Sequence, residues 1–219
     1  MPESAEPPAG LVAAQLAAKR IAAEAAQLLR PGLTEVDWQQ HVDRIAAAHG
    51  SSGQWTPVTT RVGLGTLVAH PEFPMQARAA RDGDPAFLDV TPTVDGWLGD
   101  YCISLVVGQP DAETVAVIED CRWVQQQMIA AARPGLPASE MFAVGAALAA
   151  ERNVKLLDLL DNFGHSIGRE FAVDGFIDAD NDTPMYGAWT IEPQVGRRAR
   201  GAKFEDIVWL AEGHAAVVI

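Results

Sequence analysis

The sequence predicts an α+β fold built from two similar halves, and three observations support this. One order of elements (a helix, the tetrapeptide Arg-Pro-Gly-Leu, a second helix, then strands) occurs twice within 219 residues. The long segment before each tetrapeptide has apolar residues at helical spacing. The segments after each helix pair mix β-branched and aromatic residues with turn residues, which is typical of strands and hairpins. Chance recurrence of the tetrapeptide remains an alternative, because Pro-Gly commonly ends helices.

Two helices are predicted in the first half. Residues 11–30 carry strong helix formers, and Pro31-Gly32 then ends the helix. The second helix is expected from about Thr34 to Gly50, with Glu35 in its first turn. Residues 1–10 are polar and Pro-rich, without the basic and apolar regions of a signal peptide, so they are expected to form a disordered tail.

Strands and loops are expected between and after the helix pairs. Residues 55–75 predict short strands and loops, and residues 87–90 and 97–107 predict two strands separated by Asp95-Gly96, a strong hairpin signal. The second half predicts helices and then strands, over residues 113–133, 139–151, 189–192, 204–210 and 215–219. We therefore expect one domain over residues 11–219, with halves at about 11–108 and 113–219.

Composition excludes several classes of protein. The formal charge of −13 argues against nucleic-acid and anionic-membrane partners, which favour basic surfaces. No apolar run reaches the roughly 18 residues of a membrane-spanning helix. Only Cys102 and Cys121 occur, which favours a reducing compartment over a disulfide scaffold. The expected location is the cytoplasm.

Two aspartates flank the predicted hairpin. With a two-residue turn at Asp95-Gly96, Asp89 lies opposite Cys102, and Asp89 and Asp100 become diagonal neighbours with backbones roughly 7–8 Å apart. Two ionised carboxylates so placed repel each other unless a cation lies between them, and a metal ion would fit that gap. Acids beside a turn are more often simply solvated, and Pro92 could introduce a bulge that shifts the register.

Three more polar residues lie in apolar surroundings. His165 stands between glycines and apolar residues, and Glu192 ends an apolar strand. Glu205 shares a strand face with two large apolar residues and should point inward. A buried carboxylate requires a partner, and Arg200 or Lys203 could serve Glu205 but would themselves need burying. A core histidine satisfied by one hydrogen bond is the alternative for His165.

Four carboxylates and one imidazole suit two closely spaced divalent ions such as Mn, Co, Fe or Zn. Two such ions can share a hydroxide, supply a nucleophile near neutral pH and stabilise a developing oxyanion. The sequence therefore predicts a metal-dependent hydrolase whose ligands are Asp89, Asp100, His165, Glu192 and Glu205.

From about residue 11 to 213 the sequence resembles the pita-bread metallohydrolases of peptidase family M24, which include methionine aminopeptidase, aminopeptidase P, prolidase and creatinase. The most specific segments are LDVTPTVDGWLGD (88–100), GHSIGREF (164–171), TIEPQV (190–195) and FEDIVWLAEG (204–213). All five ligand types of the family occur in order, with the family's eleven-residue gap between the aspartates. The resemblance implies the pita-bread fold, in which two pseudo-symmetric halves surround a curved antiparallel sheet.

The resemblance also implies a role for each ligand. Asp89 would bind one ion, His165 and Glu192 would bind the other, and Asp100 with Glu205 would bridge both. Glu192 would also act as general acid and base for a metal-bridging hydroxide.

Residues that contact the substrate follow from the resemblance and from the loops. His70 falls where the family keeps a histidine near the scissile bond, although a loop histidine without a role is the alternative. Trp55 and Trp97 lie in loops that could border the pocket. Ala172 departs from the family, whose peptidases usually carry a second histidine seven residues after the ligand histidine. That histidine helps to hold the scissile carbonyl and to stabilise the tetrahedral intermediate.

The leading hypothesis is an aminopeptidase-type hydrolase that cleaves an amide or C–N bond near the N-terminus of a short peptide. The alternatives are a metalloenzyme of the same fold acting on a non-peptide small molecule, which the altered position 172 favours, and a catalytically silent binding protein. Homodimers are common in the resembling family, so a homodimer is possible.

Two other motifs are incomplete. The run 63–68 lacks the third glycine of a dinucleotide loop, and residues 178–189 lack the turn glycine and closing glutamate of a calcium loop.

Overall fold

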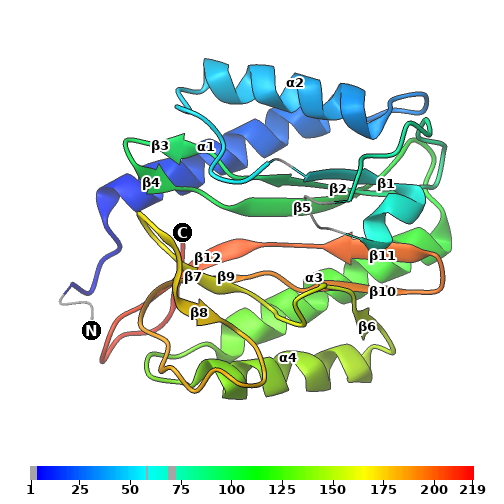
Figure 1. Cartoon of the computed structure of the whole chain (residues 1–219). Coiled ribbons are helices and arrows are strands. Elements are labelled where there is room, and N and C mark those ends of the chain that lie inside the picture. Colours follow the sequence, from blue (N-terminus) through cyan, green and yellow to red (C-terminus); the bar gives the residue numbers. More distant parts are fainter. Residues whose placement is uncertain (1–3, 58, 69–72) are drawn as a thin grey trace.

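The computed structural model describes residues 4–57, 59–68 and 73–219 and confirms the α+β class (Figure 1). Helices α1 (Ala9–Ala26) and α2 (Glu35–Ala48) lie on one side of the strands. Helices α3 (Ala112–Ala131) and α4 (Ala138–Glu151) lie on the opposite side. Each helix pair precedes its own strands in the sequence, as predicted. Within the described residues, no helix is long and apolar enough to cross a membrane.

The first half contains a three-stranded sheet and a hairpin extension. The sheet has the order β1-β2-β5, from β1 (Thr59–Val62), β2 (Pro85–Val90) and β5 (Tyr101–Val106). A short 3-10 helix, η1 (Gly63–Leu67), follows β1. Strands β3 (Thr93–Val94) and β4 (Trp97–Leu98) continue the hairpin to its turn.

The second half contains two further groups of strands. One has the order β11-β10-β6 and the other the order β13-β12-β9-β7-β8. Their bounds are β6 (Lys155–Leu156), β7 (His165–Ile167), β8 (Phe171–Phe176), β9 (Gly187–Ile191), β10 (Gln194–Arg197), β11 (Arg200–Lys203), β12 (Asp206–Leu210) and β13 (Val217–Val218). All the strand pairs found in the described part of the chain are antiparallel.

The predicted hairpin register is confirmed. Asp89 pairs with Cys102, and the same register continues through Thr93 and Leu98 to the turn. Both turn residues, Asp95-Gly96, have positive φ, at 49° and 74°, as a type I′ turn requires. Pro92 therefore causes no shift of register.

Each half has its own apolar core. One cluster joins α1 and α2 to the inner side of β2, with Trp38 and Leu88 fully buried. A second joins α3 and α4 to the strands of the second half, with Phe163 and Trp189 fully buried. Between the two cores runs a seam, where Cys102 of β5 forms a backbone bridge with Glu205. The chemistry of the chain is concentrated at this seam.

The structure corrects two predicted boundaries near the N-terminus. Helix α1 begins at Ala9, inside the predicted tail of residues 1–10, and Gly10 in its first turn packs against Trp97, whose indole leaves no room for a Cβ atom there. The same helix ends at Ala26 rather than near residue 30. Its last turn is capped by the indole nitrogen of Trp38, which donates a hydrogen bond to the Ala25 carbonyl at 2.9 Å.

A buried glutamate anchors α2 to the sheet. Glu35 is fully buried and accepts hydrogen bonds from the backbone amides of Val62 at 2.8 Å and Gln76 at 2.6 Å. Arg61 forms an ion pair with the same carboxylate at 3.5 Å. Sequence analysis placed Glu35 only in the first turn of a helix, and the structure adds that it joins α2 to β1 and to the segment at Gln76.

We expect Glu35→Ala to lower the free energy of unfolding by about 3–5 kcal/mol, because it removes the acceptor of the Val62 and Gln76 amides and the buried ion pair with Arg61. Urea denaturation measures this difference. The exposed Glu119 of α3 provides the matched control, and Glu119→Ala should change stability by less than about 0.5 kcal/mol. Equal effects of the two substitutions would contradict an anchoring role for Glu35.

Candidate metal centre

A cavity of about 440 Å³ opens at the seam between the two halves. All five residues predicted as metal ligands line it: Asp89, Asp100, His165, Glu192 and Glu205. They come from β2, the start of β5, β7, the end of β9 and the start of β12. The structure therefore brings together residues that span more than half of the sequence.

The two aspartates are held by the hairpin and by helix α1. Asp89 lies within β2, and Asp100 lies just before β5. The side chain of Gln15, fully buried in α1, accepts a hydrogen bond from the Asp100 amide at 2.8 Å and donates one to the Asp100 carbonyl at 2.7 Å. This amide clamp fixes the Asp100 backbone at the break between β4 and β5. Sequence analysis missed Gln15, since its helical position carries no signal of a distant partner.

Glu205 enters the cavity from the other half. Its amide donates to the Cys102 carbonyl at 3.0 Å, so the seam itself fixes its backbone. Two residues earlier, Ser104 Oγ donates to the Lys203 carbonyl at 2.8 Å and accepts from the Lys203 amide at 2.8 Å. The side chain of Glu205 is fully buried, as the strand alternation predicted.

The imidazole of His165 has one nitrogen anchored and one directed at the carboxylates. Nδ1 lies 3.1 Å from the Ser166 carbonyl, which can only accept, so this nitrogen carries the hydrogen. Nε2 lies 3.4 Å from Asp100 and 3.3 Å from Glu192. In the neutral ring, Nε2 therefore presents its lone pair to the cluster, as a metal ligand must.

Glu192 is held by the strand that precedes it. Its amide donates to the Phe163 carbonyl at 2.8 Å, and Thr190 Oγ1 donates to its Oε1 at 3.1 Å. Thr190 also accepts a hydrogen bond from the amide of His165 at 3.0 Å. One hydroxyl thus links the backbone of His165 to the carboxylate of Glu192.

Lys203 is the one cation within the cluster among the described residues. Its Nζ lies 2.7 Å from Asp89, 2.8 Å from Glu192 and 3.2 Å from Glu205. The sequence raised Lys203 only as one possible partner of Glu205. The structure adds its contacts with Asp89 and Glu192, which are distant from it in the sequence or lie on another strand.

Burial and charge shift the pKa values of the cluster. Burial, together with repulsion from neighbouring carboxylates, raises the pKa of Asp100 and of Glu205 well above their ordinary values. Burial also acts to raise the pKa of Glu192, but attraction by Lys203 and His165 outweighs it and holds that pKa below its ordinary value. Burial acts to lower the pKa of Lys203, and the surrounding carboxylates instead raise it well above its ordinary value.

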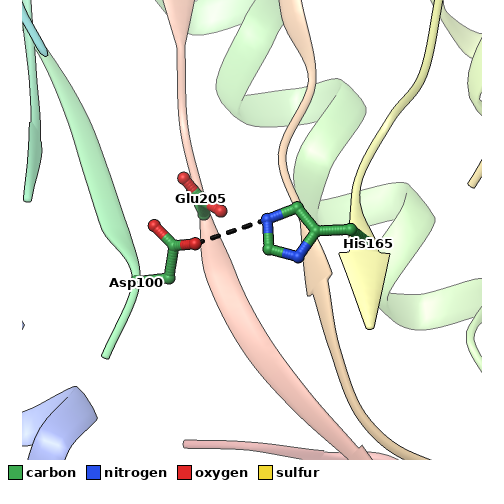
Figure 2. Close-up of side chains that lie close together, drawn as sticks. All are labelled: Asp100, His165 and Glu205. Carbon is green, nitrogen blue, oxygen red and sulfur yellow. Dashed lines mark ion pairs between the residues drawn. The ribbon is translucent and has the colours of Figure 1, made fainter. Parts of the chain in front are cut away.

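The donor set fits divalent metal ions. Asp100, His165 and Glu205 each offer one ligand atom, and these atoms lie within 4.8 Å of one another (Figure 2). Within the described part of the chain, Asp89 Oδ1 and Glu205 Oε1 are buried without a hydrogen-bond donor, and Glu205 Oε2 forms an ion pair with Lys203 at 3.2 Å. Four carboxylates against one lysine leave an excess of negative charge that a buried site cannot hold without cations or protons.

The residues predicted to contact the substrate are distributed differently. Trp55 lines the cavity, and its ring lies 4.9 Å from that of Phe171. Trp97 does not belong to the cavity lining, because it packs against Gly10 and under the guanidinium of Arg169. Ala172 follows Phe171 in β8 without lining the cavity itself. His70 lies outside the described residues.

Comparisons with known proteins agree with this geometry. The sequence model that defines metallopeptidase family M24 matches residues 9–212 of this chain. The probable dipeptidase PepE of Mycobacterium tuberculosis is 29% identical over 203 residues, which cover 91% of this chain and 53% of that protein. The chain thus spans about half the length of this relative.

Solved structures share the fold. The prolidase of Pyrococcus furiosus superposes with a TM-score of 0.84 at 20% identity, over 95% of this chain and 62% of that one. A methionine aminopeptidase of Thermotoga maritima superposes with a TM-score of 0.82 at 20% identity, over 98% of both chains. These likenesses confirm the pita-bread fold.

We expect Glu205→Gln to stabilise the metal-free protein at pH 7. Because the pKa of Glu205 is raised, the folded protein releases the proton of this carboxyl group at a higher pH than the unfolded chain does, so the free energy of unfolding falls as pH rises above the ordinary glutamate pKa. Glutamine has no such proton and should flatten this pH dependence, with a melting temperature about 2–4 °C higher for each 1 kcal/mol gained.

Thermal melts in chelator between pH 5 and 8 measure the effect. The exposed Glu212 supplies the control, and Glu212→Gln should follow the wild-type profile. A lower melting temperature for Glu205→Gln at pH 7 would show that the Glu205 carboxylate stabilises the metal-free fold.

Proposed function

The chain belongs to metallopeptidase family M24, and we propose that it is a metal-dependent hydrolase of the aminopeptidase type. Its substrate on this proposal is a short peptide, which is cleaved at an amide bond near the N-terminus. The observation that carries the proposal is the meeting of all five predicted ligand residues in one buried cavity.

Two divalent ions (Mn, Co, Fe or Zn) would be held by Asp89, Asp100, His165, Glu192 and Glu205. When bound, such ions lower the pKa of a water molecule to near neutral and polarise a carbonyl group. Two features support this ligand set. Asp89 Oδ1 and Glu205 Oε1 are buried without a hydrogen-bond donor, and the Nε2 lone pair of His165 faces the carboxylates because Nδ1 carries the hydrogen.

Glu192 is the residue to which we assign proton transfer. Its carboxylate lies at the cavity wall, where it can accept a proton from the attacking water and deliver it to the leaving amine. The Thr190 hydroxyl donates to Oε1 and orients the group, which leaves Oε2 on the side of Lys203. The lowered pKa of Glu192 keeps the carboxylate ionised and ready to accept a proton.

One part of the cavity wall is apolar. Phe171 and Phe176 lie 5.7 Å apart, and Phe171 also lies 4.5 Å from the ring of His165. Leu160 lines the same cavity while 57% of its surface is exposed. This wall suits an apolar side chain of the substrate and would exclude water from the reacting bond.

A non-peptide substrate is the second candidate, and Ala172 is the observation that favours it. The resembling peptidases usually place a carbonyl-holding histidine there, whereas this chain has alanine at a φ of 51°. Without that contact, the developing charge on a peptide carbonyl loses one stabilising donor.

We expect Glu192→Gln to reduce turnover of any true substrate by about 10²–10⁴-fold, because the amide cannot transfer the proton. The assay is a screen of short peptides with Mn or Co added, with metal content measured in parallel. Glu170→Gln, at an exposed position outside the cavity, is the matched control and should retain wild-type turnover. If the wild type and Glu192→Gln both bind a peptide equally well and neither cleaves it, the result would favour a silent binding protein.

We expect Ala172→His to raise peptide hydrolysis by about 10-fold or more if the chain is a peptidase, because one oxyanion-stabilising donor contributes about 10²–10³-fold where it is well placed. Histidine tolerates a positive φ better than most residues. Ala172→Gly, which also suits this φ, controls for the backbone and should leave the rate unchanged. A peptide rate that stays at background in Ala172→His would instead support the non-peptide substrate.

A further inference from the structure

We propose that the ammonium group of Lys203 is a built-in cation that holds the place of one metal ion when that ion is absent. The centre then loads its two ions in unequal steps, and the second ion must displace Lys203. This inference rests on the proposed two-ion centre and adds to it a control on metal occupancy by a residue of the chain itself.

The position of Lys203 Nζ carries the inference. It lies within 2.7–3.2 Å of three carboxylates, those of Asp89, Glu192 and Glu205. The Nζ atom is therefore surrounded by carboxylate oxygens, as a bound divalent metal ion would be. Only 8% of the surface of Lys203 is exposed, so it is a buried partner of the cluster rather than a surface side chain nearby.

The contacts of Lys203 divide the cluster into two unequal parts. Asp89 and Glu192 accept its short contacts, whereas Asp100 and His165 make none with it. Asp100, His165 and Glu205 already offer three ligand atoms within 4.8 Å, and Glu205 Oε1 has no hydrogen-bond donor. A first ion can therefore bind at this triad while Lys203 stays in place.

A second ion needs the carboxylates that Lys203 holds. It would have to break the contacts of Nζ with Asp89 at 2.7 Å and with Glu205 at 3.2 Å, and it would be repelled by the ammonium at close range. Lysine has a flexible four-carbon stem, and Lys203 borders the cavity, so the side chain can leave the cluster for the cavity. The affinity of the cluster for its second metal ion is then reduced, because that ion must compete with the ammonium of Lys203.

The test is a titration of the metal-free protein with Mn²⁺ by calorimetry, with the ion content checked by equilibrium dialysis. We expect two steps in the wild type, the second at least about 30-fold weaker than the first. Lys203→Met removes the ammonium, and we expect it to tighten the second step by at least about 10-fold while the first changes less than threefold. The exposed Lys155 supplies the control, and Lys155→Met should reproduce the wild-type titration.

Lys203→Arg keeps the charge and should keep the two steps unequal, which separates loss of the cation from any change of shape. If Lys203→Met folds only with metal present, its loaded form is dialysed against increasing chelator, and its second ion should leave at higher chelator than in the wild type. Two equal steps in the wild type, or an unchanged second step in Lys203→Met, would overturn the inference and leave the proposed hydrolase intact. Absence of Mn²⁺ binding in every variant would overturn the proposed function itself.

Discussion

Four carboxylates are buried together where the two halves of the chain meet, and their charge must be balanced inside the protein. Asp89 and Asp100 come from the first half, and Glu192 and Glu205 from the second. Buried charges of one sign repel each other strongly, so no arrangement of these four is stable without cations or protons among them. Lys203 supplies one positive charge, and the raised pKa values of Asp100 and Glu205 show where the balance is still incomplete. On the proposed function, divalent metal ions complete it.

The rest of the fold positions these side chains. The backbone bridge between Cys102 and Glu205 joins the sheets of the two halves at the cluster. The side chain of Gln15 holds the backbone of Asp100, and Glu35 ties helix α2 to the strand next to Asp89. Gln15 and Glu35 are both fully buried with their hydrogen bonds made, so they add specificity to the arrangement of the site. A duplicated architecture suits such a site, since each half presents two acids from its own strands.

The wall around the cluster distinguishes this chain from the peptidases that it resembles. On the resemblance, the five proposed ligands follow the family in order and type, whereas Ala172 takes the position of a histidine that would help to hold the scissile carbonyl. The aromatic rings of Trp55, Phe171 and Phe176 instead line the apolar part of the wall. Chemistry and substrate choice thus depend on different residues, and a change of substrate is possible without a change of the ligand set.

Local sequence signals were sufficient for most of the helices and for the hairpin, and they singled out the five residues that the fold gathers in one cavity. Helical spacing predicted α2, α3 and α4 to within a few residues, and Asp95-Gly96 predicted the register that pairs Asp89 with Cys102. The short strands β6, β7, β8, β10 and β11 were not predicted, because strands of two to six residues carry little periodicity of their own. Only the tertiary structure decided that Lys203 lies among the carboxylates, that Gln15 holds Asp100 and that Trp97 packs outside the cavity. The first two of these arrangements depend on contacts between residues about 85 to 115 positions apart, and the third depends on packing. A local sequence pattern contains no information about such distant contacts.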